Sequence, residues 1–496
     1  MRLLLINPRN QLVNVNNKKN YWNKYRVWKP LGLLVLAGLT PPEWEITVVD
    51  ENVDVPDYSQ LPRPDLVGLT AFTSQAPRAY EVATDFRSRG VPVVMGGIHA
   101  TMCEAEAAKQ VDAVVTGEAE SVWPQVLDDI TRGDLKPLYV GGMEDMEKMP
   151  LARQDLLPTG YYFGSIQTTR GCPLNCSFCS VSAFNGRTYR RRKVEDVVAE
   201  FKEIKENNVL IVDDNLIGTR RDHIARSKEL FRAIIEADLG KKWICQATIN
   251  MADDDELLRL ARRAGCIGVF IGFESTTPEG LVEVHKKYNI QNDRDFGASV
   301  RRIQRHRISV AGSFIMGLDV DRAGIGLHIA ETADQYGVDF LNMLFLTPLP
   351  GTDLWNRMEA EGRIAADRFP EDWKYYTLGL PVGRYKHLSR DEIIDEMNSC
   401  IQKFYSIPAI LRRVWRNFRK GQRPFLTLAG NLSYHFNGRT GRNVCQDFKQ
   451  AFDRLRPDLP LPATGDNRHV LAEGHSVSES SRQVVDVGNI TGPPGR

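Results

Sequence analysis

The chain has 496 residues, more than a single hydrophobic core normally serves, so we expect about two or three domains. Its 64 lysines and arginines balance 63 aspartates and glutamates, and this near-neutral charge gives no indication of a nucleic acid or another acidic partner. Hydrophobic residues make up 42% of the sequence, which is enough for ordinary globular packing. The longest apolar run, Leu31–Leu39, is far shorter than the roughly 20 residues that a transmembrane segment requires.

The first eight residues, Met1 to Pro8, lack the apolar core and the cleavage site of a signal peptide and read as a first strand. The eight cysteines are scattered along a long chain, unlike the disulfide framework of a small secreted domain. We therefore expect a soluble, cytoplasmic protein, in a reducing compartment that suits thiolate ligands.

Residues 1–135 alternate short apolar strands with helical segments, which is typical of an open parallel sheet. Strands are predicted at 3–6, 46–49, 66–69, 91–95 and 113–115. Helices are predicted between Pro30 and Pro41 and over the periodic stretch that ends at Gly90. The pattern predicts a Rossmann-like domain, in which ligands bind beyond the carboxyl ends of the strands.

Three loops at these strand ends combine glycine with polar side chains. The candidate binding residues in them are Thr73 and Ser74, then Gly96, Gly97 and His99, then Gly117 and Glu118. Paired glycines let a ligand approach the backbone, and hydroxyls near helix starts either cap the helix or hold polar ligand groups. Taken singly these signals are weak, because a Gly-Gly turn with a nearby histidine is more often just a tight turn, and a G-x-G-x-x-G nucleotide fingerprint is absent.

Residues 136–160 lack periodicity and are interpreted as a connector. Beyond it, from 161 to 352, strands alternate with helical stretches again. Six strands are predicted, at 165–168, 209–212, 243–248, 268–273, 309–316 and 340–346. This repeat predicts a partial (β/α)6 barrel with its site at the carboxyl ends of the strands.

Three cysteines, Cys172, Cys176 and Cys179, lie in a C-x3-C-x2-C spacing directly after the first barrel strand. Thiolates delivered by such a short run are typical ligands of iron-sulfur clusters. A structural zinc site would need a fourth ligand nearby, yet the next histidine is His223 and the next cysteine is Cys245. A four-iron cluster held by three cysteines keeps one iron open, so the motif indicates a catalytic site rather than a structural one.

The stretch from Thr169 to Cys179, with the aromatic Phe178 before the last cysteine, resembles the signature of the radical S-adenosylmethionine (SAM) superfamily. The resemblance implies that the open iron binds the amino and carboxylate groups of SAM. It also implies that one electron from the cluster cleaves SAM to a 5'-deoxyadenosyl radical, which abstracts hydrogen from a substrate. The three cysteines are then both the metal ligands and the catalytic residues, and Phe178 lies beside the cofactor.

Polar residues at the barrel strand ends are the candidates for contacts with SAM. They are Asp213, Gln246, Thr248, Glu274 and Ser275, with Asp319 and Asp321 after the fifth strand. Helix capping explains each of them equally well when it is taken alone. The superfamily often carries Gly-Gly-Glu after the second strand, where this chain has Val212-Asp213-Asp214-Asn215.

The N-terminal domain resembles the cobalamin-binding domain of cobalamin-dependent radical SAM proteins, whose strand-end loops have similar Gly-Gly-x-His and Gly-Glu-x-Glu stretches. The resemblance implies that Thr73, Ser74, Gly96, Gly97, His99, Gly117 and Glu118 bind cobalamin. The Asp-x-His-x-x-Gly motif that supplies an axial histidine elsewhere is missing, because Gly97 stands in place of its aspartate. Cobalamin without a protein histidine on cobalt is therefore implied.

Two basic stretches have alternative interpretations. Arg187 and the run 190–193 follow the cysteines, and we expect a solvated loop, with a SAM carboxylate, a cobalamin phosphate or an acidic substrate as alternatives. Residues 412–420 interleave arginine with aromatics, and a packing helix with a charged outer face is favoured over contact with lipid or nucleic acid.

The remaining C-terminal sequence departs from the barrel pattern. A helical domain is expected over 353–460, with a capping box at Ser389 and Glu392, and a disordered tail over 461–496. The stretch 346–352 is similar to that of the cobalamin-dependent branch that includes hopanoid C-methylases and the anaerobic magnesium-protoporphyrin cyclase.

The function expected from this resemblance is methylation of an unactivated carbon of a small molecule or lipid, through a 5'-deoxyadenosyl radical and methylcobalamin. The alternatives are an oxidative cyclase or rearrangement enzyme of the same architecture, and a non-catalytic cobalamin or iron-sulfur sensor. A methylthiotransferase acting on transfer RNA is not favoured, because Cys103 is the only cysteine before Cys172. A reducing partner such as flavodoxin or ferredoxin is expected, and no nucleic acid.

Overall fold

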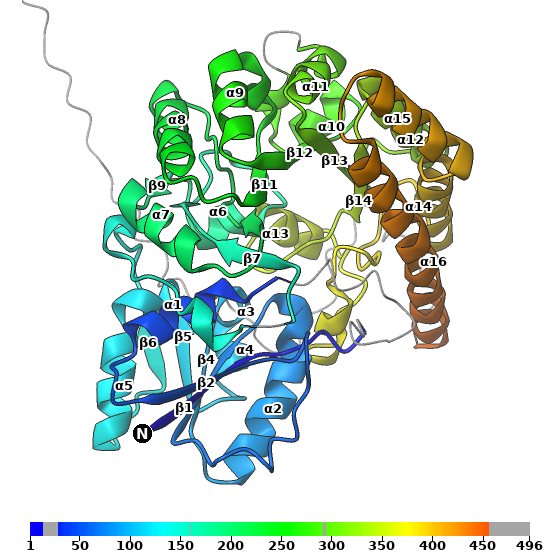
Figure 1. The fold of residues 1–496 in the computed structure, drawn as a ribbon. Coiled ribbons are helices and arrows are strands. Elements are labelled where there is room, and N and C mark those ends of the chain that lie inside the picture. Colours follow the sequence, from blue (N-terminus) through cyan, green and yellow to red (C-terminus); the bar gives the residue numbers. More distant parts are fainter. Residues whose placement is uncertain (13–27, 159, 291–293, 456–496) are drawn as a thin grey trace, which may run out of the picture. The chain divides into compact units, whose positions relative to one another are not determined.

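The computed structural model describes residues 1–12, 28–158, 160–290 and 294–455, and the tail predicted from residue 461 lies outside these ranges. Two parallel sheets of six strands each, together with a short antiparallel pair, organise the described chain (Figure 1). No helix within the described ranges combines the length and the apolar character needed to cross a membrane.

The first sheet has the strand order β2-β1-β3-β4-β5-β6, and every neighbouring pair is parallel. Its strands are β1 (Arg2–Asn7), β2 (Glu45–Asp50), β3 (Leu66–Thr70), β4 (Val93–Gly96), β5 (Ala113–Thr116) and β6 (Leu138–Val140). The helices between them are α1 (Leu31–Leu39), α2 (Ala76–Ser88), α3 (Ile98–Met102), α4 (Glu104–Ala107) and α5 (Trp123–Arg132).

Alternation along the strands explains why helices cover both faces of this sheet. Leu3 and Leu5 point into a core with α1 and α5, whereas Leu4 and Ile6 point into a second core with α2. All five predicted strands are present. β6 was not predicted, because three residues are too few to show a period, and it extends the sheet into the expected connector.

The second sheet is the open barrel, with the parallel strand order β14-β13-β12-β11-β10-β7. Its strands are β7 (Phe163–Ile166), β10 (Asn208–Ile211), β11 (Lys242–Ala247), β12 (Cys266–Glu274), β13 (Ser309–Met316) and β14 (Phe340–Phe345). Its helices are α7 (Val194–Glu203), α8 (Arg221–Glu236), α9 (Asp255–Arg263), α10 (Pro278–Glu283), α11 (Phe296–Arg305) and α12 (Ile325–Tyr336). The six predicted strands are all present, so the partial barrel is confirmed.

The C-terminal region is helical, as expected. It contains α13 (Asp353–Ala360), the short 3-10 helix η9 (Glu371–Tyr375), α14 (Arg390–Phe404), α15 (Ile407–Arg419) and α16 (Pro424–Leu455). The predicted capping box is present at the start of α14, where the Glu392 N–H donates to Ser389 Oγ at 3.3 Å. The apolar residues of the C-terminal region join two cores. Trp373 and Tyr376 belong to the core between the first sheet and α2, and Ile393 and Phe404 belong to the barrel core.

The turn after β13 is held by a buried carboxylate. Asp321 Oδ2 accepts hydrogen bonds from the N–H groups of Gly317 and Leu318 at 2.8 and 3.0 Å. Burial raises the pKa of Asp321 to about 6. Asp319, two residues earlier, pairs instead with Arg363 and Lys386 of the C-terminal region, at 2.8 and 2.7 Å.

Gly97 is expected to be intolerant of a side chain. Its φ of +91° with ψ of −174° is a conformation that L residues rarely adopt, and a Cβ would lie 2.6 Å from Thr70 Oγ1. Gly97→Ala should therefore lower the free energy of unfolding by about 3 kcal/mol. The matched control is Gly133→Ala, because Gly133 has a φ of +73° and open space around it. The control should lose only about 1 kcal/mol in urea unfolding, and equal losses would contradict the packing argument.

Asp321 is expected to make stability depend on pH. The folded protein binds this proton more tightly than the unfolded chain, so its contribution is greatest below pH 4 and is lost as the pH rises through about 6. Asp321→Asn keeps an oxygen that can accept both N–H groups but removes the charge. The drop in unfolding free energy between pH 4 and 7 should shrink by about 2 kcal/mol in this variant, measured on the apoprotein. Asp128→Asn, at an exposed carboxylate, should leave the drop unchanged.

Candidate functional site

The cysteine loop (Gly171–Cys179) connects β8 (Thr169–Arg170) to α6 (Ser180–Phe184), and β8 pairs with β9 (Arg190–Arg191) in the short antiparallel sheet. Cys172, Cys176 and Cys179 are free and half-buried. The Cys179 N–H donates to the Cys176 carbonyl at 3.1 Å. Charge on Cys172 influences the pKa of both other thiols, so the three lie within electrostatic reach of one another.

The donor chemistry of this loop fits an iron-sulfur cluster. Burial raises the pKa of Cys176 to about 12 and that of Cys179 to about 11, so the thiolates need a cation to form. Among the described residues, no three His, Cys, Asp or Glu side chains are arranged to hold a single metal ion. In a four-iron cluster each cysteine binds a different iron, so the sulfurs need not converge on one point.

Three consecutive polar residues after β10 hold the cysteine loop in place. Asp213 has no exposed surface, and its carboxylate accepts hydrogen bonds from Thr168 N and Oγ1 at 2.6 and 2.5 Å. Asp214 Oδ2 accepts from the Gly171 N–H at 2.9 Å. Asn215 Nδ2 lies 3.9 Å from Cys172 Sγ. Asp213, a candidate for SAM binding, is thus placed behind the loop, with its oxygens occupied by the chain itself.

The buried ion pair Glu274–Lys286 lies beside the cysteines. Lys286 Nζ is 2.6 Å from Glu274 Oε1, and both residues are about 7% exposed. Burial alone would lower the pKa of Lys286, but Glu274 and the thiolates of Cys176 and Cys172 raise it above its usual value. Glu274 has a φ of +66° at the end of β12, which turns it toward this lysine. A cation therefore stands next to the cysteine loop.

The other barrel candidates differ in how accessible they are. Gln246 on β11 is exposed, whereas Thr248 is buried and its Oγ1 lies 2.5 Å from Asn250 Oδ1. Ser275 is also buried, and its Oγ accepts from the Thr277 N–H at 3.2 Å. Phe178 packs against the barrel core. Of the barrel candidates, Gln246 is the one that offers an exposed side chain.

His99 in the N-terminal sheet is enclosed. Its side chain has no exposed surface, and Nε2 lies 2.9 Å from Tyr80 Oη and 3.3 Å from Glu106 Oε1. The ring also meets the edge of Trp373, whose Nε1 donates to Glu106 at 3.0 Å. His99 therefore ties α3 to α2, α4 and η9, and its ring is not presented at the strand ends.

The remaining N-terminal candidates line closely packed strand-end loops. Thr73 is buried and Ser74 is half-buried, and the Ser74 carbonyl accepts from Asn10 Nδ2 at 2.7 Å. Gly96 ends β4 and Gly97 opens α3. The Gly117 N–H donates to Thr101 Oγ1 at 3.0 Å, which joins the loops after β4 and β5. The exposed aromatic among these loops is Phe72, at 65%.

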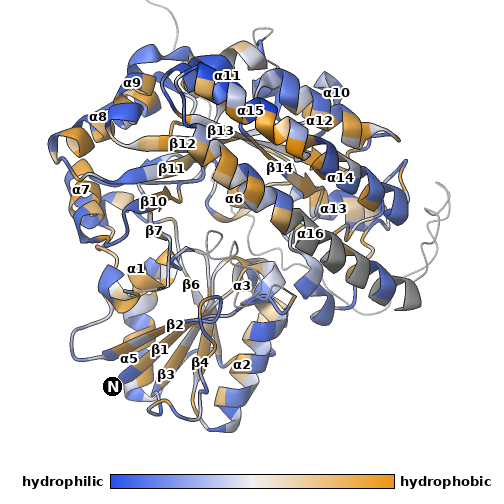
Figure 2. Ribbon diagram, turned by 45° about the vertical axis from the view of Figure 1, so that its right-hand side comes forward, coloured by the Kyte–Doolittle hydropathy of each residue, from blue (hydrophilic) through white to orange (hydrophobic). Residues whose placement is uncertain are grey.

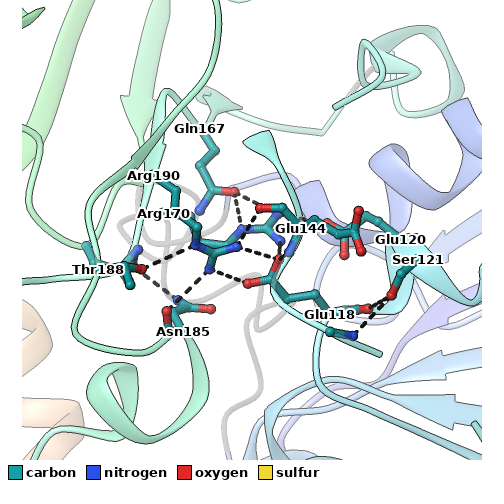
Figure 3. Close-up of polar contacts among 12 residues, drawn as sticks. Glu118, Glu120, Ser121, Glu144, Gln167, Arg170, Asn185, Thr188 and Arg190 are labelled. Carbon is teal, nitrogen blue, oxygen red and sulfur yellow. Dashed lines mark hydrogen bonds and ion pairs between the residues drawn. The ribbon is translucent and has the colours of Figure 1, made fainter. Parts of the chain in front are cut away.

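Glu118, after β5 of the first sheet, contacts the short β8–β9 pair that frames the cysteine loop. It is 4% exposed, and Arg190 Nη1 and Arg170 Nη1 lie 2.8 and 2.9 Å from its Oε2 (Figure 3). A second Arg190 nitrogen reaches Oε1. Arg170 Nη2 also pairs with Glu120 at 2.8 Å. Burial alone would raise the pKa of Glu118, but the two guanidinium groups hold it below its usual value.

This arrangement brings together the loops on which the candidates lie. Arg170 is two residues before Cys172, so the carboxyl end of β5 contacts the segment that leads into the cysteine loop. In addition, α3 after β4 lies against α6 after Cys179. Figure 3 shows the Glu118 and Glu120 side chains facing the arginines of the β8–β9 pair.

The expectation of a solvated basic loop is wrong for two of its arginines. Arg190 is paired with Glu118, and Arg192 is 4% exposed with Nη1 2.8 Å from Glu200 Oε2. Alternation explains this: Arg190 and Arg192 are two residues apart and point to the same, covered side, whereas Arg191 and Lys193 between and after them are exposed. The sequence also gave no signal for Lys286, because its partner Glu274 stands on the preceding strand, 12 residues away.

Comparison with known families identifies both halves of this arrangement. Residues 166–323 match the radical SAM superfamily, residues 24–127 match the B12 binding domain, and residues 352–432 match a domain of unknown function (DUF4070). The first match runs from the end of β7 through β13 of the barrel, and the second includes β2 to β5 of the first sheet.

Relatives agree with this assignment. The chain is 28% identical over 409 residues to the bacteriochlorophyllide d C-12(1)-methyltransferase of Chlorobaculum tepidum, covering 78% of this chain and 84% of the relative. It is 27% identical over 394 residues to the hopanoid C-2 methylase of Rhodopseudomonas palustris, covering 77% and 72%. The anaerobic magnesium-protoporphyrin IX monomethyl ester cyclase of Rubrivivax gelatinosus is 25% identical over 431 residues, covering 78% and 75%.

A solved structure shows the same fold. The radical SAM methyltransferase TsrM from Kitasatospora setae, with cobalamin and a [4Fe-4S] cluster bound, superposes with a TM-score of 0.58 at 19% identity. The match covers 74% of this chain and 79% of that chain.

Replacing Glu118 should destabilise the protein strongly. Glu118→Gln leaves two largely buried guanidinium groups without their shared carboxylate, and we expect a loss of about 3 kcal/mol in unfolding free energy. The matched control is Glu45→Gln, which breaks the exposed Arg2–Glu45 pair and should cost less than about 1 kcal/mol. Urea unfolding measures both. A loss at Glu118 no larger than that of the control would show that the bridge does not hold the sheets together.

The cofactors follow from the matched domains and from the donor groups present. The matched radical SAM domain implies a [4Fe-4S] cluster and SAM, and the thiols of the cysteine loop are the kind of donor that such a cluster uses. The matched B12 binding domain implies cobalamin. The chain therefore carries a radical SAM domain and a B12 binding domain, and it is a cobalamin-dependent radical SAM enzyme whose cofactors are a [4Fe-4S] cluster, SAM and cobalamin.

Proposed function

We propose that this enzyme methylates an unactivated carbon of a small molecule or lipid, with SAM as the methyl source and cobalamin as the methyl carrier. The observation that carries the proposal is the Glu118 bridge, because it holds the cobalamin-binding sheet against the cysteine loop. Methyl transfer through cobalamin requires both cofactors to reach one substrate carbon. The two relatives named as methyltransferases or methylases support the same reaction.

The cofactors would supply the difficult chemistry, with the cluster cleaving SAM to a hydrogen-abstracting radical and cobalamin delivering the methyl group. The protein would position them. In this proposal Cys172, Cys176 and Cys179 bind three irons, and Asp214 and Asn215 keep the loop in shape from behind.

The Glu274–Lys286 pair would act where SAM meets the cluster. A buried ammonium group beside the cysteines stabilises the negative charge that thiolates and a reduced cluster bring to the loop. Gly272 leaves room for this pair, since a Cβ there would overlap Glu274 Oε1 and lie 2.6 Å from Lys286 Nζ. Gln246, with its exposed amide, remains our candidate for a direct contact with SAM.

The cobalt would carry no histidine from this chain. His99 is enclosed by Tyr80, Glu106 and Trp373, and moving its ring to the strand ends would break its contacts with all three. We propose that the backbone at Gly96, Gly97 and Gly117 and the hydroxyls of Thr73 and Ser74 contact cobalamin instead. Glu118 would act indirectly, by positioning.

Oxidative cyclisation on the same architecture is not favoured, because the cyclase relative shares less identity with the chain than the methylating relatives do. The overall reaction also needs electrons. We propose a reducing partner of the flavodoxin or ferredoxin type and, with it, a cytoplasmic location.

The test uses anaerobically purified enzyme, reconstituted with hydroxocobalamin and iron-sulfur cluster and given a reductant and SAM deuterated on its methyl group. We expect 5'-deoxyadenosine together with transfer of the deuterated methyl group to the bound cobalamin. In extracts that contain the substrate, a product should carry the three deuterium atoms. Mass spectrometry detects all of these species.

The control compares two cysteine variants. Cys176→Ala should reduce 5'-deoxyadenosine to the level of a protein-free sample, because it removes a cluster ligand. Cys445→Ala, in α16, should leave it unchanged. A dehydrogenated product without deuterium would indicate oxidative cyclisation instead of methylation. SAM cleavage by enzyme without bound cobalamin would rule out cobalamin as the methyl carrier.

A further inference from the structure

Helix α15 carries an apolar face on the molecular surface. Ile407, Leu411, Trp415 and Phe418 are 48%, 57%, 61% and 63% exposed, and their spacing places them along one side of the helix. Trp415 and Phe418 stack with ring centroids 5.8 Å apart. Figure 2 shows hydrophobic and hydrophilic segments alternating along the ribbon of α15. We call these four residues the α15 apolar face.

This face is not the one that packs on the protein. Ala409, Ile410, Arg413 and Asn417 are the buried residues of α15, and they point to the opposite side. Arg413 Nη2 donates to Asn431 Oδ1 at 2.8 Å, and Asn417 Nδ2 donates to Asp339 Oδ1 at 2.6 Å. The structure thus agrees with the expected packing helix, whose inner face is half apolar and half polar. The outer face carries the expected charge at Arg412 and Arg419, but it also carries the four apolar residues, which were not expected there.

Exposure is concentrated here rather than scattered. Sixteen large hydrophobic side chains are exposed in the described part of the chain, and five of them lie between Ile407 and Phe425. Phe425, at the start of α16, is 85% exposed. Single exposed apolar side chains are ordinary, but a contiguous set with two stacked aromatics marks an interaction surface.

The charge around the face is positive. Between Glu396 and Phe425 the sequence has no acidic residue and seven basic ones, namely Lys403, Arg412, Arg413, Arg416, Arg419, Lys420 and Arg423. Arg412 and Arg419 are exposed and flank one side of the apolar face. Burial, and then the neighbouring Arg416 and Arg301, lowers the pKa of Lys420, so basic groups of α11 adjoin the same surface.

Acidic groups offset little of this charge. Asp334 on α12 lies 3.3 Å from Arg412 and 3.8 Å from Arg413, and Glu331 lies 3.5 Å from Lys403. Burial, and then the nearby charge of Arg262, lowers the pKa of Arg423, so Arg423 and Arg262 form a second pair of neighbouring cations. This surface would be complemented by a partner that presents many negative charges over an area, with an apolar layer directly behind those charges.

We propose that the α15 apolar face docks the enzyme on an anionic membrane surface. Trp415, Phe418 and Leu411 enter the boundary between headgroups and acyl chains, and Arg412 and Arg419 contact lipid phosphates. Aromatic and aliphatic residues on one side of a helix with arginines beside them are typical of helices that lie in a membrane interface.

Two other occupants fit less well. A symmetric contact between two copies would set the basic flank of one against the same flank of the other, which is repulsive. A nucleic acid would use the arginines and the aromatic rings, but it leaves Ile407 and Leu411 without an apolar partner. This inference does not depend on the proposed methyl transfer.

The test is flotation of the full-length holoenzyme with vesicles of phosphatidylcholine alone or mixed with phosphatidylglycerol. We expect binding to the mixed vesicles that weakens as salt is added. Leu411→Ser/Trp415→Ser should weaken binding at least about 10-fold, because it removes the inserted side chains. Arg412→Gln/Arg419→Gln should weaken it about 25-fold on anionic vesicles, since each cation near such a surface contributes about 5-fold.

The matched control is Leu138→Ser/Val140→Ser, which removes two exposed apolar side chains from β6 in the first sheet. It should bind vesicles as the unchanged enzyme does. No binding to anionic vesicles at low salt, or equal binding by the Leu411/Trp415 variant, would overturn the proposal. So would a dimer in sedimentation analysis that the Leu411/Trp415 variant converts to monomers, because the face would then be occupied by a second copy.

Discussion

The carboxylate of Glu118 is shared between two arginines, and the geometry of the site depends on that sharing. Glu118 ends the loop after β5, whereas Arg170 and Arg190 belong to the strand pair that frames the cysteine loop. Removing one carboxylate and two guanidinium groups from water costs free energy that their attraction offsets only in part. Such a triad adds little net stability, but it fixes relative position, because any shift leaves a buried charge without a partner. The cobalamin-binding sheet and the barrel are thereby held with their strand ends together.

The cysteine loop is also held in place by polar contacts from neighbouring segments. Asp213 is fully buried and cannot reach a ligand. Each residue of the segment Asp213-Asp214-Asn215 nevertheless contacts the cysteine loop or the residues that lead into it. The loop itself has little regular structure of its own. Its shape is imposed by the end of β10 on one side and by Lys286 and the Val284 carbonyl, which accepts from the Ser177 N–H at 3.1 Å, on the other.

Much of the fold could be predicted from the sequence, because buried parallel strands are short apolar runs bounded by glycine and polar residues. Leu66 to Leu69 and Ser309 to Met316 are such runs, whereas Leu138 to Val140 is too short to stand out. The position of the three-cysteine loop after the first barrel strand was also predictable, since the cysteine spacing is local. Side-chain direction was not: Glu118 and His99 lie in the expected loops, but only the tertiary partners Arg190 and Glu106 show that their side chains are occupied. The orientation of α15 could not be predicted for the same reason, because Arg413 and Asn417 are buried on its inner face beside Ala409 and Ile410, while larger apolar residues are exposed.

The burial of Trp373 and Tyr376 against α2 has a consequence for how the chain reaches its folded state. The core on that face of the first sheet draws on residues that are far apart in sequence, because Tyr80 and Val93 belong to the same cluster as Trp373 and Val382. During synthesis the first sheet would leave the ribosome long before those partners exist, with an apolar face uncovered. Contacts between such distant segments slow folding, since a long loop must close before they form. The cobalamin-binding half is therefore not a module that could be cut out and grafted elsewhere, even though its strands are contiguous in sequence.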